Sequence, residues 1–438
     1  MNDDVPDWSD DEIPVFGEED EDRPPPRKRP KLLTPELEAE ILSGFPEMEP
    51  EQAVLDALTC NKHGEPLPTP LNVQTILDND TRWDEAIRLN EFSGRVWVRI
   101  PNEEDAPMRE TTHTKALLWM AQVYGINPSP NVVLAAMAVS AEANSWHPVR
   151  DYLSGLEWDG EPRVDDLLPK YFGVEDTVLT RAMSRGFMVS CVARVMRPGC
   201  KVDTVLVLQG GGGVGKSTAC GILAKQESWF SDTPPEWHNK DLYGNMSGKW
   251  IVELAEIDEH LRGVSRSKVK ATLSSRIDTY RRPYDRIPQD YPRQTVMMGS
   301  TNEPVFLDDP TGTRRFWPVT VGAVDTASLQ QDVDQLWAEA VQMFQGGEPW
   351  HLSREMSRLL EEASERFTYR DPWEPLVGAF LAQRTEVTLG DVYEGALNVS
   401  DRTRWGGKSD HRLASVMRGV GWASTRNERR ERVWRKKA

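Results

Sequence analysis

The sequence has few cysteines and no long apolar run. Cys60, Cys191, Cys200 and Cys220 are its only cysteines among 438 residues, and no two of them have CxxC spacing. This argues against a zinc site or a disulfide framework, and it is typical of a protein in a reducing cytoplasm. No run reaches the roughly 18 apolar residues of a membrane-spanning helix, so we expect no membrane partner.

Basic side chains are absent from the start of the chain. Residues 1–22 contain eleven acids and no base, and they lack the apolar core of a signal peptide. Residues 402–438 show the reverse, with twelve Lys and Arg against three acids, although the net charge of the chain is −18. This asymmetry indicates contact with nucleic acid.

The N-terminal third divides into two segments. Residues 1–33 cannot bury enough apolar surface to fold alone. A solvating tail, a mimic of DNA, and a nuclear import signal in the basic cluster 23–31 remain open as interpretations. Residues 34–154 are predicted to be mixed and mostly helical, with a short hairpin around 92–98 and helices at 114–124 and 130–143.

The rest of the chain divides into three segments. Apolar runs of strand length alternate with helical patterns over 155–345, which predicts a three-layer α/β domain. Residues 346–372 are polar and are predicted to be a connector. Residues 373–438 are predicted to be a small, basic, separate unit.

The strongest motif follows an apolar strand. The run TVLVLQ at 204–209 precedes GGGGVGKS at 210–217, which matches G-x-x-x-x-G-K-[ST]. In this P-loop pattern, backbone N–H groups surround phosphates, Lys216 reaches the β- and γ-phosphates, and Ser217 is a Mg²⁺ ligand. ATP and Mg²⁺ are therefore the expected cofactors. The residues expected at the nucleotide are Gly210, Gly211, Gly212, Gly213, Val214, Gly215, Lys216, Ser217 and Thr218.

Two further strands end in polar side chains. The run KWIVELAEI at 249–257 carries Glu253 and Glu256, and we predict Glu256 as the acid that faces the metal or activates water. Glu253 is interpreted as its supporting partner or as an ordinary strand-end acid. The run QTVMMGSTN ends at Asn302, whose amide can hold the attacking water without adding charge, unless it is only a turn residue.

Two arginines precede the last strand of this domain. Arg314 and Arg315 lie in TGTRRFWPV at 311–319. One of them is a candidate arginine finger, which stabilises transition-state charge and is often supplied in trans by a neighbouring subunit. Surface salt bridging is the competing interpretation.

The ordered set of motifs resembles the virulence-associated protein E family, whose ATPase domain is akin to superfamily 3 helicases and poxvirus-type primase–helicases. The resemblance covers about residues 72–345. It rests on HPVRDYL and EWDGEPR between 147 and 163, RPGCKVD at 197–203, the P-loop, the 250–256 strand, DTYRRPY at 278–284, the 299–302 strand end, TGTRRFWP at 311–318 and QLWAEA at 335–340.

This resemblance implies an AAA+-like ATPase that forms a ring, in the simplest case a hexamer, around DNA in a bacterial host cell. Glu256 then looks like the Walker B acid, Asn302 like sensor 1 and Arg315 like the arginine finger, with Arg314 as a substitute. The Glu-Leu-Ala-Glu spacing departs from the adjacent acids of many superfamily 3 members. The division of roles between Glu253 and Glu256 therefore stays open.

The family also implies a β-hairpin that enters the DNA channel. The window 279–293 offers arginines for phosphates and tyrosines for base stacking, which is how single strands are held without sequence preference. The alternative is that the tyrosines pack the hairpin and the arginines form a solvated cluster. The candidate DNA contacts in this window are Tyr280, Arg281, Arg282 and Arg286.

The basic C-terminal unit is predicted to be a winged helix. Its pattern is a helix at 374–383, a short strand, helices at 389–397 and 409–419, and a hairpin from 422. Use of this fold for protein contacts is the alternative. The candidate duplex-DNA contacts are Arg412, Arg418, Arg429, Arg430 and Arg432.

No constellation for a primase is visible. Asp332 and Asp334 form an Asp-x-Asp pair, but we interpret them as helix-capping residues. A helicase or translocase that works with a separate primase or host replication proteins is the first hypothesis. An ATP-switched origin-binding protein that recruits a host helicase is the second, and a P-loop kinase is disfavoured because no acceptor site is apparent.

Overall fold

The computed structural model describes residues 49–438 except 234, 238, 240, 262–264, 283–286, 308–312, 370, 402–404, 427–431 and 437–438. Its contacts form two compact units. The first contains the chain up to Asp84 with Arg99–Asp105 and Arg109–Met137, and the second contains Glu85–Val98, Ala106–Met108 and Ala138–Ala438. Within the described part of the chain, no helix combines the length and apolarity needed to cross a membrane.

The first unit is helical around an aromatic core. Trp83 packs edge-on against Trp119, with ring centroids 5.4 Å apart. The Tyr124 hydroxyl donates to the buried Asp80 carboxylate over 2.6 Å. The two helices predicted here are confirmed, and the second crosses the boundary between the units. The helices are α2 (Gln52–Ala57), α3 (Pro70–Asn79), η1 (Thr81–Trp83), α4 (Thr112–Tyr124) and α5 (Pro130–Ala143).

A small sheet opens the second unit, with strand order β3-β2-β1-β4. The predicted hairpin is confirmed, because β1 and β2 pair antiparallel around a turn that contains Gly94. The short helix α6 (Pro148–Ser154) follows the sheet. The strands are β1 (Ile87–Asn90), β2 (Arg95–Val98), β3 (Ala106–Pro107) and β4 (Ser145–Trp146).

The main sheet has five parallel strands in the order β11-β5-β10-β7-β6. Strand β5 reads as a continuous apolar run because both of its faces are covered. Val205 and Val207 join one buried cluster, whereas Leu206 and Leu208 join the other. The mixed α/β class is therefore confirmed. The strands are β5 (Val205–Gln209), β6 (Phe230–Ser231), β7 (Ile251–Leu254), β10 (Val296–Thr301) and β11 (Phe316–Thr320).

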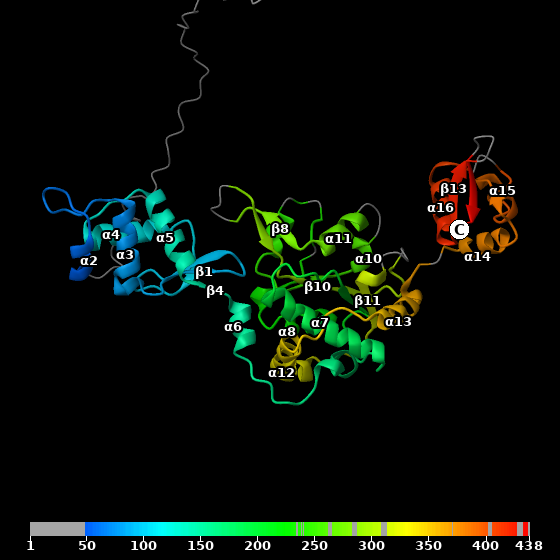
Figure 1. The fold of residues 1–438 in the computed structure, drawn as a ribbon, viewed down its shortest axis with the longest axis horizontal. Helices are drawn as coiled ribbons and strands as arrows, with labels where there is room; N and C mark the ends of the chain where they lie inside the picture. The colour runs from blue at the N-terminus through cyan, green and yellow to red at the C-terminus, as the bar shows by residue number, and fades with distance from the viewer. Residues whose placement is uncertain are drawn as a thin grey trace, which may run out of the picture. The chain divides into compact units, whose positions relative to one another are not determined.

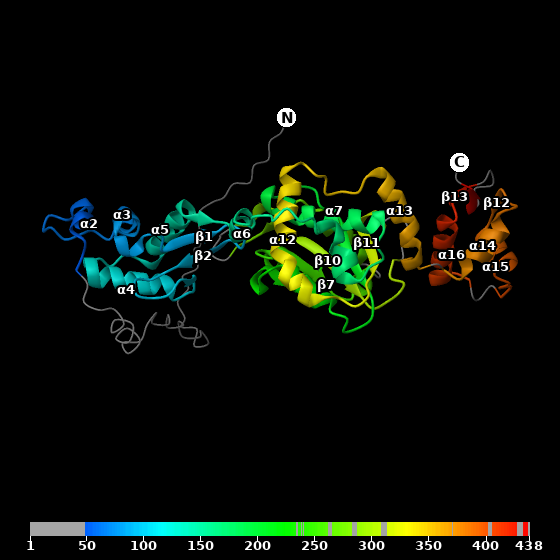
Figure 2. The same ribbon diagram turned by 90° about the horizontal axis from the view of Figure 1, so that it is seen from below.

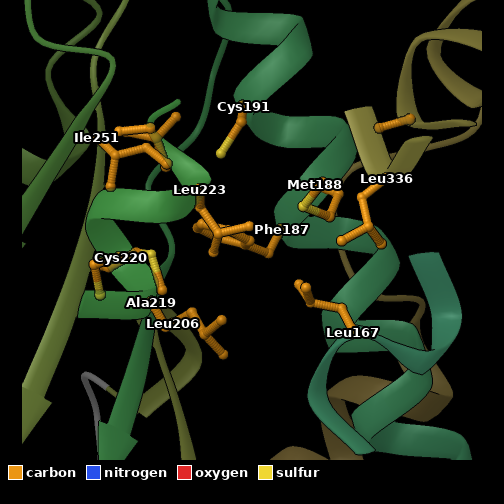
Figure 3. Close-up of a cluster of buried hydrophobic side chains, with 14 of the residues drawn as sticks. Leu167, Phe187, Met188, Cys191, Leu206, Ala219, Cys220, Leu223, Ile251 and Leu336 are labelled. Atoms are coloured by element: carbon orange, nitrogen blue, oxygen red, sulfur yellow. The ribbon is translucent and has the colours of Figure 1, made fainter. Parts of the chain in front are cut away.

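Helices cover both faces of this sheet. Figure 1 shows α7, α8 and α12 on one side of the sheet and α10 and α11 on the other, and Figure 2 shows α7 and α12 beside the strands from a second direction. In the first layer, Phe187 points toward Leu223 and Met188 faces Leu336, as Figure 3 shows. The helices are α7 (Val178–Met196), α8 (Lys216–Leu223), α9 (Leu242–Met246), α10 (Ile257–His260), α11 (Ser265–Ser274) and α12 (Thr326–Gln345), with short turns η2 (Val164–Asp166), η3 (Leu167–Tyr171), η4 (Glu227–Trp229) and η5 (Thr313–Arg315).

The capping interpretation of Asp332 and Asp334 is wrong. Helix α12 begins at Thr326 and is capped by Asp325, which accepts from the Ser328 N–H. Asp332 accepts from the Tyr171 hydroxyl at 2.6 Å. Asp334 accepts from the Lys225 ammonium at 2.9 Å. The pair therefore anchors neighbouring elements to the middle of α12.

The polar segment predicted as a connector contains a packed helix. Helix α13 (Arg354–Ser364) buries Leu360, and the turn η6 (Glu365–Phe367) buries Phe367. Polar residues dominate the segment because only a narrow stripe of α13 faces the domain.

Two elements predicted to meet DNA are present as secondary structure. Strands β8 (Ile277–Tyr280) and β9 (Gln289–Pro292) form an antiparallel hairpin before β10. The C-terminal unit has the predicted order of elements around its own core, with Trp434 fully buried. Its winged-helix assignment stays a prediction. Its elements are α14 (Trp373–Leu381), β12 (Glu386–Val387), α15 (Leu389–Gly395), α16 (Gly407–Gly419), β13 (Trp422–Arg426) and β14 (Arg432–Lys436).

Candidate functional site

The candidate site lies where strands β5, β7 and β10 end. Thr301 of β10 pairs with Gln209 of β5, so Asn302 and Gly210 emerge side by side. The carboxyl ends of parallel strands are where open α/β sheets bind ligands. The motifs predicted from three separate segments therefore meet at one edge.

The glycine-rich loop turns directly into helix α8. Gly213 and Gly215 have φ angles of +76° and +99°, which residues with a Cβ rarely adopt. Helix α8 then begins at Lys216, so its first N–H groups face the loop. The loop therefore leads directly to the N–H groups at the start of α8, and its role as a phosphate cradle stays a prediction.

Lys216 lies at the centre of the cluster. Its ammonium donates to the carbonyl oxygens of Gly210 and Gly211, each over 2.8 Å, and to Asn302 Oδ1 over 2.9 Å. Burial lowers the pKa of Lys216, while the charges of Glu256 and Glu253 act to raise it. The Lys216 ammonium therefore joins the glycine-rich loop to the residue that follows β10.

Glu253 is the buried carboxylate of the site. Its side chain is fully buried, and Oε1 accepts from Ser217 Oγ at 2.7 Å and from Ser300 Oγ at 2.6 Å. Its Oε2 is also buried and has no hydrogen-bond partner among the described residues. A buried carboxylate oxygen without a partner is costly, which is the condition that a cation relieves.

Glu256 has a different environment. It is exposed, it lies just beyond β7 with φ of +46°, and it precedes helix α10. Its Oε1 accepts from Asn302 Nδ2 at 3.3 Å. Glu256 is therefore exposed and bonded to Asn302, whereas Glu253 is buried and bonded to Ser217.

The two candidate arginines lie at the start of β11. Arg315 is partly buried, and its Nε donates to Ser274 Oγ at the end of α11 over 3.2 Å. Arg314 is exposed. The structure thus places Arg315 against α11 and leaves Arg314 at the surface, and both roles stay predictions.

The candidate DNA contacts of the β8–β9 hairpin include one exposed residue and two that pack against other side chains. Arg281 is exposed. The Tyr280 hydroxyl donates to Ser247 Oγ over 2.7 Å, and the Arg282 guanidinium lies 3.9 Å from the centre of the Tyr291 ring. Tyr280 and Arg282 are therefore engaged in packing. Arg286 lies outside the described residues.

The C-terminal candidates are also divided. Arg412 binds Asp371 with two nitrogens, at 2.7 and 2.8 Å, and lies 4.0 Å from the centre of the Trp373 ring. Arg432 donates to Ser424 Oγ at 2.9 Å across the β13–β14 hairpin. Arg418 is exposed on α16. Arg429 and Arg430 lie outside the described residues.

Sequence reasoning missed three polar residues that support the site. Ser300 donates to Glu253, and Thr301 donates to the buried Asp258 carboxylate at 2.9 Å. Adjacent hydroxyl residues at the end of an otherwise apolar strand were the available signal. Two adjacent hydroxyl residues point to opposite faces of a strand, so they indicate that polar groups contact both faces of β10 at its carboxyl end.

Residues 153–369 match the virulence-associated protein E-like domain family. No curated protein shows significant similarity to the chain. Among solved structures, an apo form of the C-terminal region of NrS-1 is similar at 12% identity, with a TM-score of 0.44, over 80% of this chain and 86% of that chain. A second apo form of that region is similar at 12% identity, with a TM-score of 0.43, over 81% of this chain and 88% of that chain.

Proposed function

Because residues 153–369 form a virulence-associated protein E-like domain, we propose that the chain is an ATP-dependent DNA helicase or translocase of a phage, prophage or satellite. In this proposal it works as a homo-oligomeric ring in replication initiation, together with a separate primase or host replication proteins. One observation carries the proposal. Five residues drawn from three segments meet at the sheet edge in two hydrogen-bonded groups, Lys216 with Asn302 and Glu256, and the adjacent Ser217 with Glu253.

The residues present fit a divalent cation. Ser217 Oγ and Glu253 are in contact, and the second oxygen of Glu253 lacks a partner among the described residues. We propose that these two residues hold Mg²⁺, which would neutralise charge on the β- and γ-phosphates. Glu256 was the metal-side candidate from the sequence alone, and the geometry favours Glu253 for that role.

The other residues then divide the chemistry of hydrolysis. Backbone N–H groups of the loop bind phosphate oxygens, and Lys216 adds positive charge where charge develops. Glu256 is exposed beside Asn302, so it is placed to accept a proton from a water that Asn302 orients. Arg315 or Arg314 of a neighbouring subunit would complete the site.

The test is ATP hydrolysis with and without single-stranded DNA. We expect DNA to stimulate the wild type, and we expect Lys216→Ala to lose about a hundredfold or more of its turnover. Lys201→Ala is the matched control, because Lys201 precedes the opposite end of β5 and its side chain is 71% exposed. Equal activity of Lys216→Ala and the control would refute the assignment of the loop.

A second candidate function is favoured by one observation. Tyr280 and Arg282 are packed against other residues, which weakens the case for a hairpin that grips DNA. The alternative is an ATP-switched origin-binding protein that recruits a host helicase. Turnover that ignores single-stranded DNA, in a protein that still binds duplex through residues 373–438, would select this alternative.

A further inference from the structure

The turn that joins β1 to β2 is held firmly in the second unit. Asn90 Oδ1 accepts from the N–H groups of Phe92 and Ser93, each at 3.0 Å, and Gly94 N–H donates to the Asn90 carbonyl at 2.7 Å. Phe92 is buried in the main core, with its ring 5.3 Å from that of His147. The turn is therefore a rigid feature, fixed by its own hydrogen bonds and by one core side chain.

The β8–β9 hairpin contacts this turn at its loop end, where the chain leaves β8 after Tyr280. The Arg282 guanidinium stacks on Tyr291 of β9, and the Nε end of the same side chain lies against Gly94. A Cβ placed on Gly94 would lie only 2.1 Å from Arg282 Nε. Arg282 is thus held between Tyr291 and a position that has room for it only because residue 94 is glycine.

A second line of contacts joins the same two elements. Tyr280 donates to Ser247 Oγ at 2.7 Å, and Ser247 Oγ donates to the Ser93 carbonyl at 3.2 Å. The ring centroids of Tyr280 in β8 and Tyr291 in β9 lie 4.7 Å apart, so this aromatic pair connects both strands of the hairpin to the hydrogen bonds through Ser247. The turn therefore contacts the hairpin directly through Gly94 and indirectly through Ser93 and Ser247.

The inner end of the hairpin is fixed separately. Arg293 and Asp278 form a buried ion pair, with Nε donating to Oδ1 at 2.9 Å. Arg293 also donates to the Thr272 carbonyl near the end of α11. Because this pair is independent of the turn, loss of the turn contacts leaves the hairpin attached to the domain.

We propose that residues Asn90–Gly94 form a hairpin seat that fixes the loop end of the β8–β9 hairpin, and that Arg282 is a positioning residue rather than a DNA ligand. This rests on the proposed function, because it states which part of the hairpin is presented to DNA. Among the described residues of this loop, contact with single-stranded DNA then comes from the exposed Arg281. Because it is held at its inner end by Arg293 and Asp278 and at its loop end by the seat, the hairpin can pass force between DNA and strand β10, which follows it.

Amide hydrogen exchange of the full-length protein tests the seat without DNA. Gly94→Ala pushes the flexible end of Arg282 off Tyr291, so we expect exchange in β8 and β9 to become about tenfold faster while α8 stays unchanged. Gly125→Ala is the matched control. The backbone φ angles are nearly the same, +69° at Gly125 and +67° at Gly94, so an alanine is strained to a similar degree at both positions. At Gly125, however, no atom lies within 4 Å of the added Cβ. Equal exchange in the two variants would overturn the seat.

A double variant separates the steric effect of the added methyl group from the effect of backbone strain at position 94. Arg282→Ala removes the side chain that a methyl group added at position 94 would strike. In the double variant Gly94→Ala/Arg282→Ala, the added methyl group has no side chain to strike. The amides of β8 and β9 in the double variant should therefore exchange as fast as they do in Arg282→Ala alone. Additive effects of the two substitutions would contradict direct contact between residues 94 and 282.

The functional consequence is measured separately. Gly94→Ala should keep its basal ATP hydrolysis and lose most of the stimulation by single-stranded DNA, whereas Gly125→Ala should keep both. Full stimulation of Gly94→Ala despite a loosened hairpin would show that the seat does not position a DNA contact. A wild type without stimulation would refute the proposed function, and the exchange result would still decide the seat.

Discussion

At the scale of single residues, burial separates two glutamates that look alike in sequence. Glu253 is fully buried and bound to Ser217, whereas Glu256 is exposed and bound to Asn302. A buried carboxylate can be retained at this cost when a cation compensates it. The exposed carboxylate of Glu256 is in contact with solvent. The two acids are therefore suited to different steps.

Substitution of each glutamate by glutamine tests this division. Glu253→Gln should raise the Mg²⁺ concentration for half-maximal ATP hydrolysis by about tenfold or more, because it removes charge from the metal side. Glu256→Gln should keep that concentration near the wild-type value and lower the turnover number by about a hundredfold, because it removes a proton acceptor.

Glu259→Gln serves as the control for both, since Glu259 is an exposed acid of α10. A reversed pattern, with Glu256→Gln changing the Mg²⁺ dependence, would return the metal-side role to Glu256.

At the scale of elements, some arginines predicted to bind DNA hold secondary structure together. Arg412 joins α16 to the start of α14 through Asp371 and Trp373. This ion pair holds the pKa of Asp371 below its ordinary value. Arg418, six residues later on the same helix, is exposed. One helix therefore offers a structural arginine and a candidate DNA contact for direct comparison.

Alanine substitution should separate the two arginines of α16. Arg412→Ala should destabilise the C-terminal unit by about 1 kcal/mol, because it removes a partly exposed bidentate pair and a cation–π contact. Arg418→Ala should leave the unfolding temperature unchanged and weaken duplex binding, with a smaller salt dependence.

Thermal unfolding and binding over a series of salt concentrations make this comparison. An Arg418→Ala variant that binds duplex as the wild type does, at every salt concentration, would favour the alternative that this unit contacts protein.

At the scale of the whole molecule, the candidate site gathers its groups from one chain, yet the candidate arginines lie at the start of β11, apart from the loop. Arg315 is bound to Ser274 of α11. A site completed by an arginine from a neighbour needs an oligomer, and the proposed ring supplies that neighbour.

Mixing two inactive variants tests the ring. Lys216→Ala lacks a working loop and Arg315→Ala lacks the finger, so each alone should be inactive. In mixed oligomers, about a quarter of the interfaces would pair an intact loop with an intact arginine, and activity should recover to about that fraction. Molar mass measured with ATP present shows whether oligomers form.

No recovery from variants that do assemble would mean that Arg315 acts within its own subunit or not at all. Arg314→Ala in the same mixture distinguishes the two arginines, since Arg314 is the exposed one.

The sequence alone predicted the α/β class, the loop at 210–217, the strand before it and the helix after it. These features are local: glycines, an apolar run and a lysine at fixed spacing need no knowledge of distant residues. The β1–β2 hairpin and the helices at 112–124 and 130–143 were predictable for the same reason.

Only the tertiary structure decided which side chains meet. The contact of Ser217 with Glu253 joins residues 36 positions apart, and that of Lys216 with Asn302 joins residues 86 apart, through a strand order that places β10 between β5 and β7. The packing of Arg282 on Gly94 depends on two elements far apart in the chain. Composition could mark these residues as polar, basic or small, but burial and neighbours, which set their chemistry, arise only when the chain folds.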